Sequence, residues 1–300
     1  MERIFDEGLV ASRHRRARAS AMPGAAFLME WAVEDLADRL ATVQRRFERA
    51  AAVLCRTDHA ARSLVASGKV GAVQRVEDDP SLLDASQDGQ VATGGDLGLA
   101  PESFDLVVSL LALQEVNDVP GALVQMRRAL RPDGLLLAAM AGTGTLAELR
   151  DSLLAAELEL TGGVSPRVAP LADVREAGAL LQRAGLALPV TDVETLTVRY
   201  ATMFDLLRDL RAMGVTNAMR ARSRRPATRA LFRRAAEIYA ERFADADGRV
   251  RATFSVIWMS GWAPHGSQQQ PLKPGSGAVS LADALAAGAW PPAGDDEANE

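Results

Sequence analysis

Cysteine and histidine, the side chains that most often act as nucleophiles, bases or metal ligands, are rare in this chain. Cys55 is the only cysteine, which excludes an internal disulfide and a cysteine-based metal cage. The three histidines, His14, His59 and His265, are scattered and lack partners at the i, i+4 spacing of a helical metal site. Cys55 has no neighbouring base in a catalytic pattern, so we interpret its thiol as unreactive. The cysteine and the histidines therefore predict no metal site and indicate no catalytic group.

Arginine supplies almost all of the positive charge, because Lys69 and Lys273 are the only lysines. Guanidinium groups pair well with carboxylates, so a dense arginine run could bind an acidic protein. Two such runs occur, at residues 13–18 and 220–234. A solvated helix face is the simpler interpretation of the first run. For the second run, a solvated surface and a binding site for an acidic protein have equal weight. The net charge of −5 gives no overall attraction to nucleic acid. The first run is Arg13, Arg15, Arg16 and Arg18, and the second is Arg220, Arg222, Arg224, Arg225, Arg229, Arg233 and Arg234.

The elements that must position these residues follow from the apolar runs, which alternate with helix-like segments. The buried strands are predicted at residues 50–55, 70–76, 104–113 and 135–141. A helix at 120–130 is expected to end at the turn Arg131-Pro132-Asp133-Gly134. This alternation favours a parallel sheet covered by helices on both faces. Runs at 186–200 and 251–263 are expected to complete the sheet, the last as an antiparallel edge strand.

The remainder of the chain predicts helical additions to one α/β domain. Residues 27–47 carry apolar side chains at a period close to 3.6, which is typical of an amphipathic helix. Residues 1–46 are therefore interpreted as a helical segment packed on a domain of residues 47–264. Within that domain a helical lid is predicted at about 201–245. Residues 265–300 have the composition of a flexible acidic tail.

The apolar runs are all too short to cross a membrane. The longest, such as Leu135–Ala141, fall far below the roughly 18 residues that span a bilayer. The N-terminus lacks the apolar stretch of a secretion signal. We therefore expect a cytoplasmic protein without a membrane span.

Two blocks resemble the S-adenosylmethionine (SAM)-dependent methyltransferases. Ser103–Ser109 (SFDLVVS) with Leu113–Asp118 (LQEVND) resembles the fourth strand of that family and the loop after it. Met126–Leu137 (MRRALRPDGLLL) resembles the following helix, turn and fifth strand. The resemblance implies a Rossmann-like α/β fold whose mostly parallel seven-stranded sheet has helices on both faces. It also implies an antiparallel last strand, a helical insertion before that strand, and SAM as cofactor.

Two further segments narrow the resemblance to one subfamily. They are Ile4-Phe5-Asp6 and Phe204–Asn217 (FDLLRDLRAMGVTN). This subfamily holds the malonyl-carrier-protein methyltransferases of biotin synthesis and the mitochondrial complex I assembly factor 5. The chain resembles bacterial relatives of that assembly factor along nearly its whole length, to about Pro264. The assembly factor is regarded as an arginine hydroxylase acting on a complex I subunit.

The resemblance also implies residues at the cofactor. The acid that binds the ribose hydroxyls follows the second strand and here could be Glu77 or Asp78. The acid near the adenine would be Asp96, which a turn aspartate explains equally well. The fourth strand and its loop would contribute Leu110 and Gln114, with Gln114 facing the transferred methyl group or the acceptor.

Two acids near the fourth strand are interpreted differently. Asp105 is expected to be structural and to fix the start of that strand, rather than to act in catalysis. Glu115 stands where the family usually has an aromatic or other bulky residue, and the sequence offers no reason for its charge.

The loop after the first strand departs from the family pattern, which is roughly D-x-G-x-x-x-G. Its glycines let backbone amides approach the cofactor without a Cβ between them. Ala52 stands at the position of the acid, and Leu54 and Asp58 stand at the positions of the glycines. The cofactor contacts expected from this loop are therefore those of Ala52, Leu54 and Cys55, and SAM binding is expected to be weak or lost.

Three functions remain open at this point. The first is SAM-dependent methyl transfer to a small molecule, an acidic protein or a carrier protein, a reaction that depends mostly on positioning. The second is a non-catalytic binding or complex I assembly role, which explains the missing glycines. The third is hydroxylation of a protein arginine, although the sequence offers no two-histidine, one-carboxylate iron set. A nicotinamide-dependent dehydrogenase is disfavoured by the same missing glycines.

Overall fold

The computed structural model describes residues 3–83 and 88–269. The strands are β1 (Phe47–Val53), β2 (Val70–Glu77), β3 (Gly89–Val91), β4 (Phe104–Leu110), β5 (Leu130–Ala141), β6 (Ala187–Tyr200) and β7 (Val250–Trp262). The helices are α1 (Glu7–Ser20), α2 (Phe27–Thr42), α3 (His59–Ala66), α4 (Val119–Ala129), α5 (Ala147–Thr161), α6 (Val174–Arg183), α7 (Met203–Ala212) and α8 (Arg229–Phe243), with short 3₁₀ helices η1 (Pro80–Leu82) and η2 (Leu113–Glu115).

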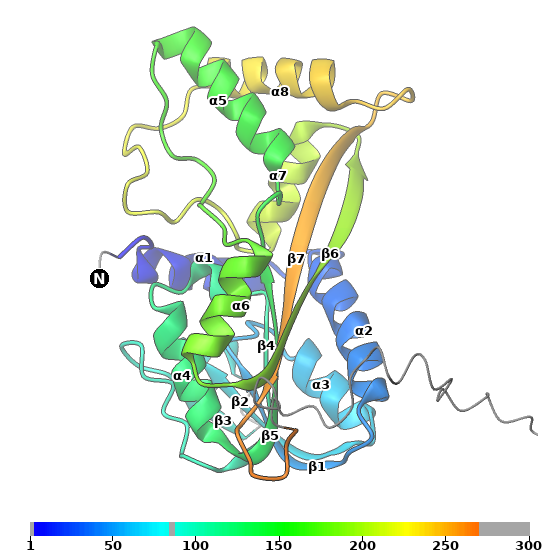
Figure 1. Ribbon diagram of the computed structural model, residues 1–300. Coiled ribbons are helices and arrows are strands. Elements are labelled where there is room, and N and C mark those ends of the chain that lie inside the picture. The colour runs from blue at the N-terminus through cyan, green and yellow to red at the C-terminus, as the bar shows by residue number, and fades with distance from the viewer. Residues whose placement is uncertain (1–2, 84–87, 270–300) are drawn as a thin grey trace, which may run out of the picture. The chain divides into compact units, whose positions relative to one another are not determined.

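Within the described residues, seven strands form one sheet in the order β3-β2-β1-β4-β5-β7-β6 (Figure 1). The first five of these strands run parallel to one another. β7 is antiparallel to both of its neighbours, β5 and β6. The predicted Rossmann-like fold is therefore confirmed. The predicted edge position of the last strand is wrong, because β7 is buried between β5 and β6 and the exposed β6 forms the edge.

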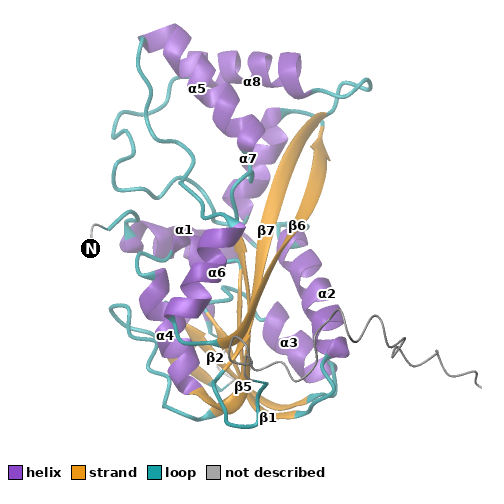
Figure 2. Ribbon diagram, in the orientation of Figure 1, coloured by secondary structure: helices purple, strands orange, loops and turns teal. Residues whose placement is uncertain are grey.

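The parallel strands are apolar on both faces because helices cover both (Figure 2). Alternate residues of a strand point to opposite faces. Ala51 and Val53 of β1 belong to a core shared with α4 and α6. Ala50 and Ala52 belong to a second core shared with α2 and α3. This explains why the sequence shows continuous apolar runs rather than an alternating pattern.

The segment predicted as a helical lid lies between the far ends of β6 and β7 and holds α7 and α8. β5 pairs with β7 only from Val256 to Trp262, whereas β6 follows β7 as far as Val250. Beyond the reach of β5, the two long strands pack against α5, α7 and α8 in a separate apolar core. The lid is thus tied to the sheet through continuous strands, as Figure 1 shows.

Some element boundaries differ from the sequence prediction. α2 ends at Thr42 and Phe47 already belongs to β1, so the predicted helix at 27–47 is too long. The turn expected at 131–134 lies inside β5, where the pairing register shifts and Asp133 has a φ of +63°. Within the run at 186–200, separate strand pieces at Leu186–Val190 and Val193–Tyr200 are expected from the sequence, but they are the single strand β6. In each case pairing with a distant strand decides the boundary, and local residue types do not reveal it.

The described residues up to His265 form one compact unit, and those from Gly266 onward are assigned to another. Residues 270–300, which hold the acidic end of the expected tail, lie outside the described residues. The proposed boundaries at 46/47 and at 201–245 stay predictions.

Candidate functional site

The strand order reverses between β1 and β4, since β1 is followed to one side by β2 and to the other by β4. In open parallel sheets, the crevice at the carboxyl ends of the two strands that flank this reversal is the usual ligand site. The loop of residues 54–58, the end of β2 and the end of β4 meet at this edge. The predicted residues Ala52, Leu54 and Leu110 lie there and are buried.

The loop keeps left-handed backbone although it has lost its glycines. Leu54 has a φ of +55° and Arg56 a φ of +62°. Such a conformation costs a residue with a Cβ roughly 1–2 kcal/mol. Asp58 has a φ of −87°, which any residue adopts. The sequence placed the missing glycines at Leu54 and Asp58, whereas the backbone that favours glycine is at Leu54 and Arg56.

Arg56 connects this loop to Glu77 and Asp78 at the end of β2. Its backbone amide donates a 3.1 Å hydrogen bond to Oε2 of Glu77. Its guanidinium Nη1 pairs with Oδ1 of Asp78. The side chain is only 8% exposed, so Arg56 fills the space between the loop and the end of β2. No sequence prediction singled out Arg56, although it lies between two positions already identified as departures.

Glu77 is enclosed by arginine. Its Oε1 accepts a 3.0 Å hydrogen bond from Nη2 of Arg75, and both side chains are buried. Burial raises the pKa of Glu77 to about 7, against the opposing charges of Arg56 and Arg75. Cys55 lies beside them, and burial, together with the charge of Glu77, raises the pKa of its thiol to about 12. The thiol is therefore neutral near pH 7, as the sequence interpretation expected.

Gln114, predicted to face the methyl group or the acceptor, bonds within the chain. Its Nε2 donates to the carbonyl oxygen of Leu111 at 2.6 Å, and its Oε1 accepts from the amide of Ala141 at 3.3 Å. The side chain thus bridges the ends of β4 and β5 at the same edge as the loop. Its predicted role at the acceptor stays a prediction.

Asp96 makes its contacts away from these residues. It lies exposed in a turn, where its Oδ1 accepts a 2.8 Å hydrogen bond from the amide of Gly98. The turn is held to α4 by Gln125, whose side chain bonds to Gly95 and Leu97. This geometry is that of a turn aspartate, and none of its contacts reaches the loop of residues 54–58.

Asp105 holds the start of β1 against β4 and β5. Its Oδ2 accepts hydrogen bonds from the amides of Glu48 and Arg49, and its Oδ1 accepts one from Arg131. Burial works against the charged form, but these bonds and the charge of Arg131 lower the pKa of Asp105. The contacts support the structural interpretation of this residue.

Helix α1 lies across the edge where the loops meet (Figure 1). Nε2 of His14 lies 2.8 Å from Oε2 of Glu115 in η2, and both side chains are nearly buried. Arg15 pairs with Asp79, just after β2, and Arg18 donates to the carbonyl of Leu82 in η1. Glu115, unexplained by the sequence, is therefore the partner of His14.

The first arginine run is largely solvated, as the sequence favours, since Arg15, Arg16 and Arg18 are exposed and Arg13 is partly buried. Some of these side chains also make contacts within the chain. Arg15 and Arg18 contact the segment after β2, and Arg13 donates to the carbonyl of Thr216. The run attaches α1 to the domain, a role that periodicity alone does not predict.

In this conformation the residues do not fit the ribose of SAM. The carboxylate of Glu77 is 0% exposed and both of its oxygens are already hydrogen-bonded. The carboxylate of Asp78 is shared with Arg56. Of the two acids at the end of β2, Glu77 is closed to a ribose, and Oδ1 of the partly exposed Asp78 is occupied by Arg56.

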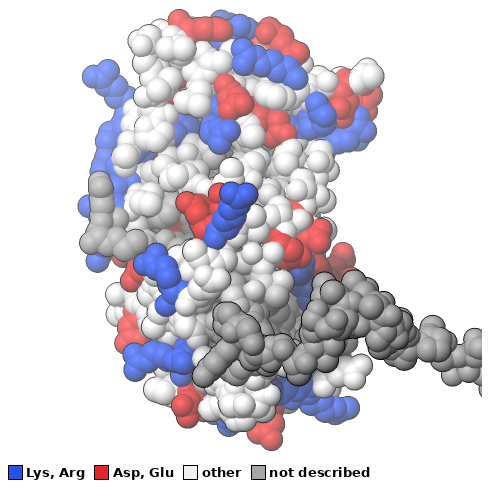
Figure 3. Space-filling view, viewed as in Figure 1, with Lys and Arg blue, Asp and Glu red and all other residues white. Residues whose placement is uncertain are grey.

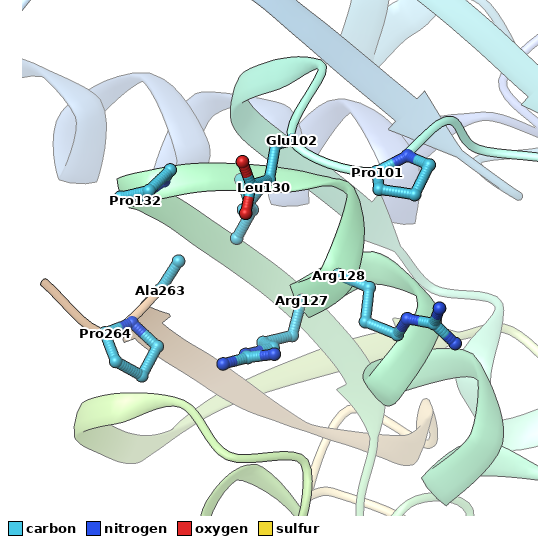
Figure 4. A pocket seen from close by; sticks show the side chains of 8 residues that line it. All are labelled: Pro101, Glu102, Arg127, Arg128, Leu130, Pro132, Ala263 and Pro264. Atoms are coloured by element: carbon cyan, nitrogen blue, oxygen red, sulfur yellow. The ribbon is translucent and has the colours of Figure 1, made fainter.

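Two surface depressions lie elsewhere on the domain. One, of about 200 Å³, is formed by residues before β4, at the start of β5 and after β7 (Figure 4). This is the opposite end of the parallel strands from the loop of residues 54–58. The other, of about 410 Å³, includes the turn that holds Asp96. We assign neither to the cofactor.

Within residues 3–83 and 88–269, no group of three or more His, Cys, Asp and Glu side chains is arranged to hold a metal ion. None of the helices in these ranges has the length and apolar character needed to span a bilayer.

A family model described as a methyltransferase domain matches residues 52–138, from the end of β1 into β5. The mitochondrial arginine-hydroxylase NDUFAF5 of Danio rerio is 44% identical over 181 residues, which are 60% of this chain and 56% of that protein. The match therefore spans little more than half the length of that relative. The rat NDUFAF5 is 36% identical over 268 residues, covering 86% of this chain and 76% of the relative.

A malonyl-[acyl-carrier protein] O-methyltransferase of Laribacter hongkongensis is 31% identical over 287 residues, covering 90% of this chain and 94% of the relative. Among solved structures, the YcgJ protein of Bacillus subtilis superposes with a TM-score of 0.54 at 16% identity, covering 78% of this chain and 99% of that one. At this identity the superposition shows the fold alone. Fold, motifs and relatives agree: the chain belongs to the class I SAM-dependent methyltransferase family, whose cofactor is S-adenosylmethionine.

Proposed function

We propose that this protein is a cytoplasmic methyltransferase that uses SAM. Its methyl acceptor is an acidic protein or a group borne by a carrier protein. The observation that carries the choice of acceptor is an unpaired group of arginines beside the crevice. We call this group the arginine surface. It consists of Arg220, Arg224, Arg225 and Arg229.

The arginine surface is exposed, and no carboxylate of the described residues lies within ion-pair distance of it. Its neighbours in the same run differ, since Arg222 pairs with Asp6 and Arg234 pairs with Glu159. Figure 3 shows positive side chains along the margin where the segment before α8 lies in Figure 1. Unpaired guanidinium groups on one surface attract carboxylates from a partner.

The arginine surface is also close to the candidate site. The segment that bears it is joined to the start of α1 by hydrogen bonds from the amide of Asp6 to Ala218 and from the amide of Arg220 to Ile4. Since α1 crosses the loops after β2 and β4, a partner bound to these arginines would lie beside the crevice. The Laribacter relative is named for a protein-borne acceptor of this kind.

A second candidate is a methyltransferase-fold protein that binds or assembles other proteins without methyl transfer. The buried Glu77 and its arginine neighbours favour it, because the acid expected to bind ribose is already engaged. The third candidate is hydroxylation of a protein arginine. Its support is that the NDUFAF5 relatives are named arginine-hydroxylases.

Isothermal calorimetry with S-adenosylhomocysteine (SAH) separates the first two candidates. Binding by the folded wild-type protein is expected, and no heat at millimolar ligand would exclude the methyltransferase proposal. The acceptor is tested separately, by transfer of label from methyl-labelled SAM to acidic carrier proteins.

The matched variants for the acceptor test are Arg224→Ser with Arg225→Ser, and Arg175→Ser with Arg183→Ser on α6. All four arginines are exposed, so each double variant removes the same charge. Labelling should fall only when the arginine surface is changed, and the loss should be largest at low salt. Equal effects of the two double variants would exclude this surface as the docking site.

A further inference from the structure

We propose that Arg56 and Asp78 form a latch that closes the ribose end of the cofactor crevice, and that SAM binds only when Arg56 leaves Asp78. The inference rests on the proposed function in that the crevice is taken as the place of SAM. The inference attributes the poor fit of the SAM ribose to the side chain of Arg56 rather than to the loss of glycines in general.

Arg56 has a left-handed backbone, and its side chain is buried against the end of β2. Its guanidinium pairs with Asp78 and its amide donates to Glu77, so a single residue engages both acids at the end of β2. Leu54 has the same backbone conformation but is apolar and belongs to the core.

The hydrogen-bonding groups of the closed arrangement are incompletely satisfied. Nε of Arg56 is buried and has no hydrogen-bond acceptor among the described residues. A buried donor without an acceptor is unfavourable, so the closed form is held less firmly than a fully bonded pair would be. By contrast, the carboxylate of Asp78 is partly exposed, which leaves a path by which the pair can separate.

The segment next to the latch is attached to α1. Asp79, which directly follows Asp78, pairs with Arg15 of α1. Movement of Asp78 is therefore restricted on one side, whereas Arg56 belongs to a loop that ends only at α3. Arg56 is the member of the pair that must move when ligand enters.

The test is calorimetry of SAH binding to the wild-type protein and to Arg56→Gly, with Leu54→Gly as the matched control. Both substitutions relieve left-handed strain in the same loop, but only the first removes the latch. SAH should bind Arg56→Gly about tenfold more tightly than wild type or better, and Leu54→Gly, which removes a Cβ at the crevice but leaves the latch in place, should tighten binding less. Arg56→Lys keeps a cation beside Asp78 and should stay close to wild type.

Circular dichroism confirms that each variant is folded. If Arg56→Gly does not fold, Arg56→Asn replaces it, because asparagine tolerates left-handed backbone. Equal tightening by Arg56→Gly and Leu54→Gly would overturn the latch and leave general loop strain as the cause. Unchanged affinity in Arg56→Gly, with measurable binding by wild type, would overturn the latch and leave the proposed function standing.

The remaining outcomes separate the two proposals. Binding by Arg56→Gly but none by wild type at millimolar SAH would support the latch and exclude the methyltransferase proposal for the natural chain. No binding by wild type, by Arg56→Gly, or by the triple variant with glycine at positions 54, 56 and 58 would overturn both.

Discussion

The backbone amide of Arg56 donates a 3.1 Å hydrogen bond to Oε2 of Glu77, across the gap between the loop after β1 and the end of β2. The bond turns the carboxylate inward, where Arg75 meets its other oxygen. Glu77, which would bind a ligand in an open crevice, is therefore buried in the protein interior. This relationship has consequences for stability as well as for binding.

Glu77 should make the protein less stable as the pH rises toward neutrality. Burial raises its pKa from an ordinary value of 4.5 to about 7, so between these values the folded protein holds a proton that the unfolded chain releases. The free energy of unfolding should fall by about 1–3 kcal/mol from pH 5 to pH 8 relative to Glu77→Gln, which does not titrate. Urea unfolding of both proteins at several pH values measures the difference. Parallel pH profiles would mean that Glu77 is charged in the folded state throughout.

The pair of His14 and Glu115 should hold α1 on the domain. Both side chains are nearly buried and their atoms are 2.8 Å apart, so loss of one partner leaves a buried polar group unsatisfied. His14→Ala should lower the free energy of unfolding by about 1–3 kcal/mol and speed proteolysis near residues 20–26. Arg16→Ala, an exposed change in the same helix, is the control and should change stability by less than about 0.5 kcal/mol. Similar effects of both variants would show that α1 is held by other contacts.

Glu157 should stabilise the segment between α5 and α6 in a pH-dependent way. Arg167 donates two hydrogen bonds to its carboxylate and Ser165 donates two more. The bonds from Arg167, and then those from Ser165, lower its pKa to about 2 against the effect of burial. The stabilisation is present above the ordinary pKa of 4.5 and is lost as the pH falls toward 2.

Glu157→Gln should therefore lower the free energy of unfolding at pH 7 by about 2–3 kcal/mol, with a difference from wild type that shrinks below pH 4.5. Glu159→Gln removes a carboxylate from the exposed pair with Arg234 in the same helix and should have a smaller effect. Thermal unfolding at pH 3, 5 and 7 measures both. A pH-independent effect of Glu157→Gln would contradict the assignment.

The sequence predicts the parallel half of the sheet well, because its strands are buried on both faces and appear as continuous apolar runs. β4 is apolar except for Asp105 and Ser109, and it lies at 104–110 within the predicted 104–113. The order of the last two strands is not predictable in the same way. β7 has the alternation of an edge strand but is covered by β6, and only the paired register reveals this.

The site is predictable only in part, for a physical reason. The acids at 77 and 78 follow a recognisable strand, so their place at the carboxyl edge could be inferred. Arg56 could not be predicted as a site residue, because residue type alone reveals neither its left-handed backbone nor the burial of its side chain. The partners His14 and Glu115 are 101 residues apart, and no periodic pattern links them.

The central claim is that Arg56 closes the place where the ribose of SAM would bind. Its most direct test is a crystal structure of Arg56→Gly grown with saturating SAH. The account predicts the adenosyl group between the loop of residues 54–58 and the end of β2, with its ribose hydroxyls at Glu77 or Asp78. An empty crevice with the loop unchanged, or SAH bound at another place on the domain, would contradict it.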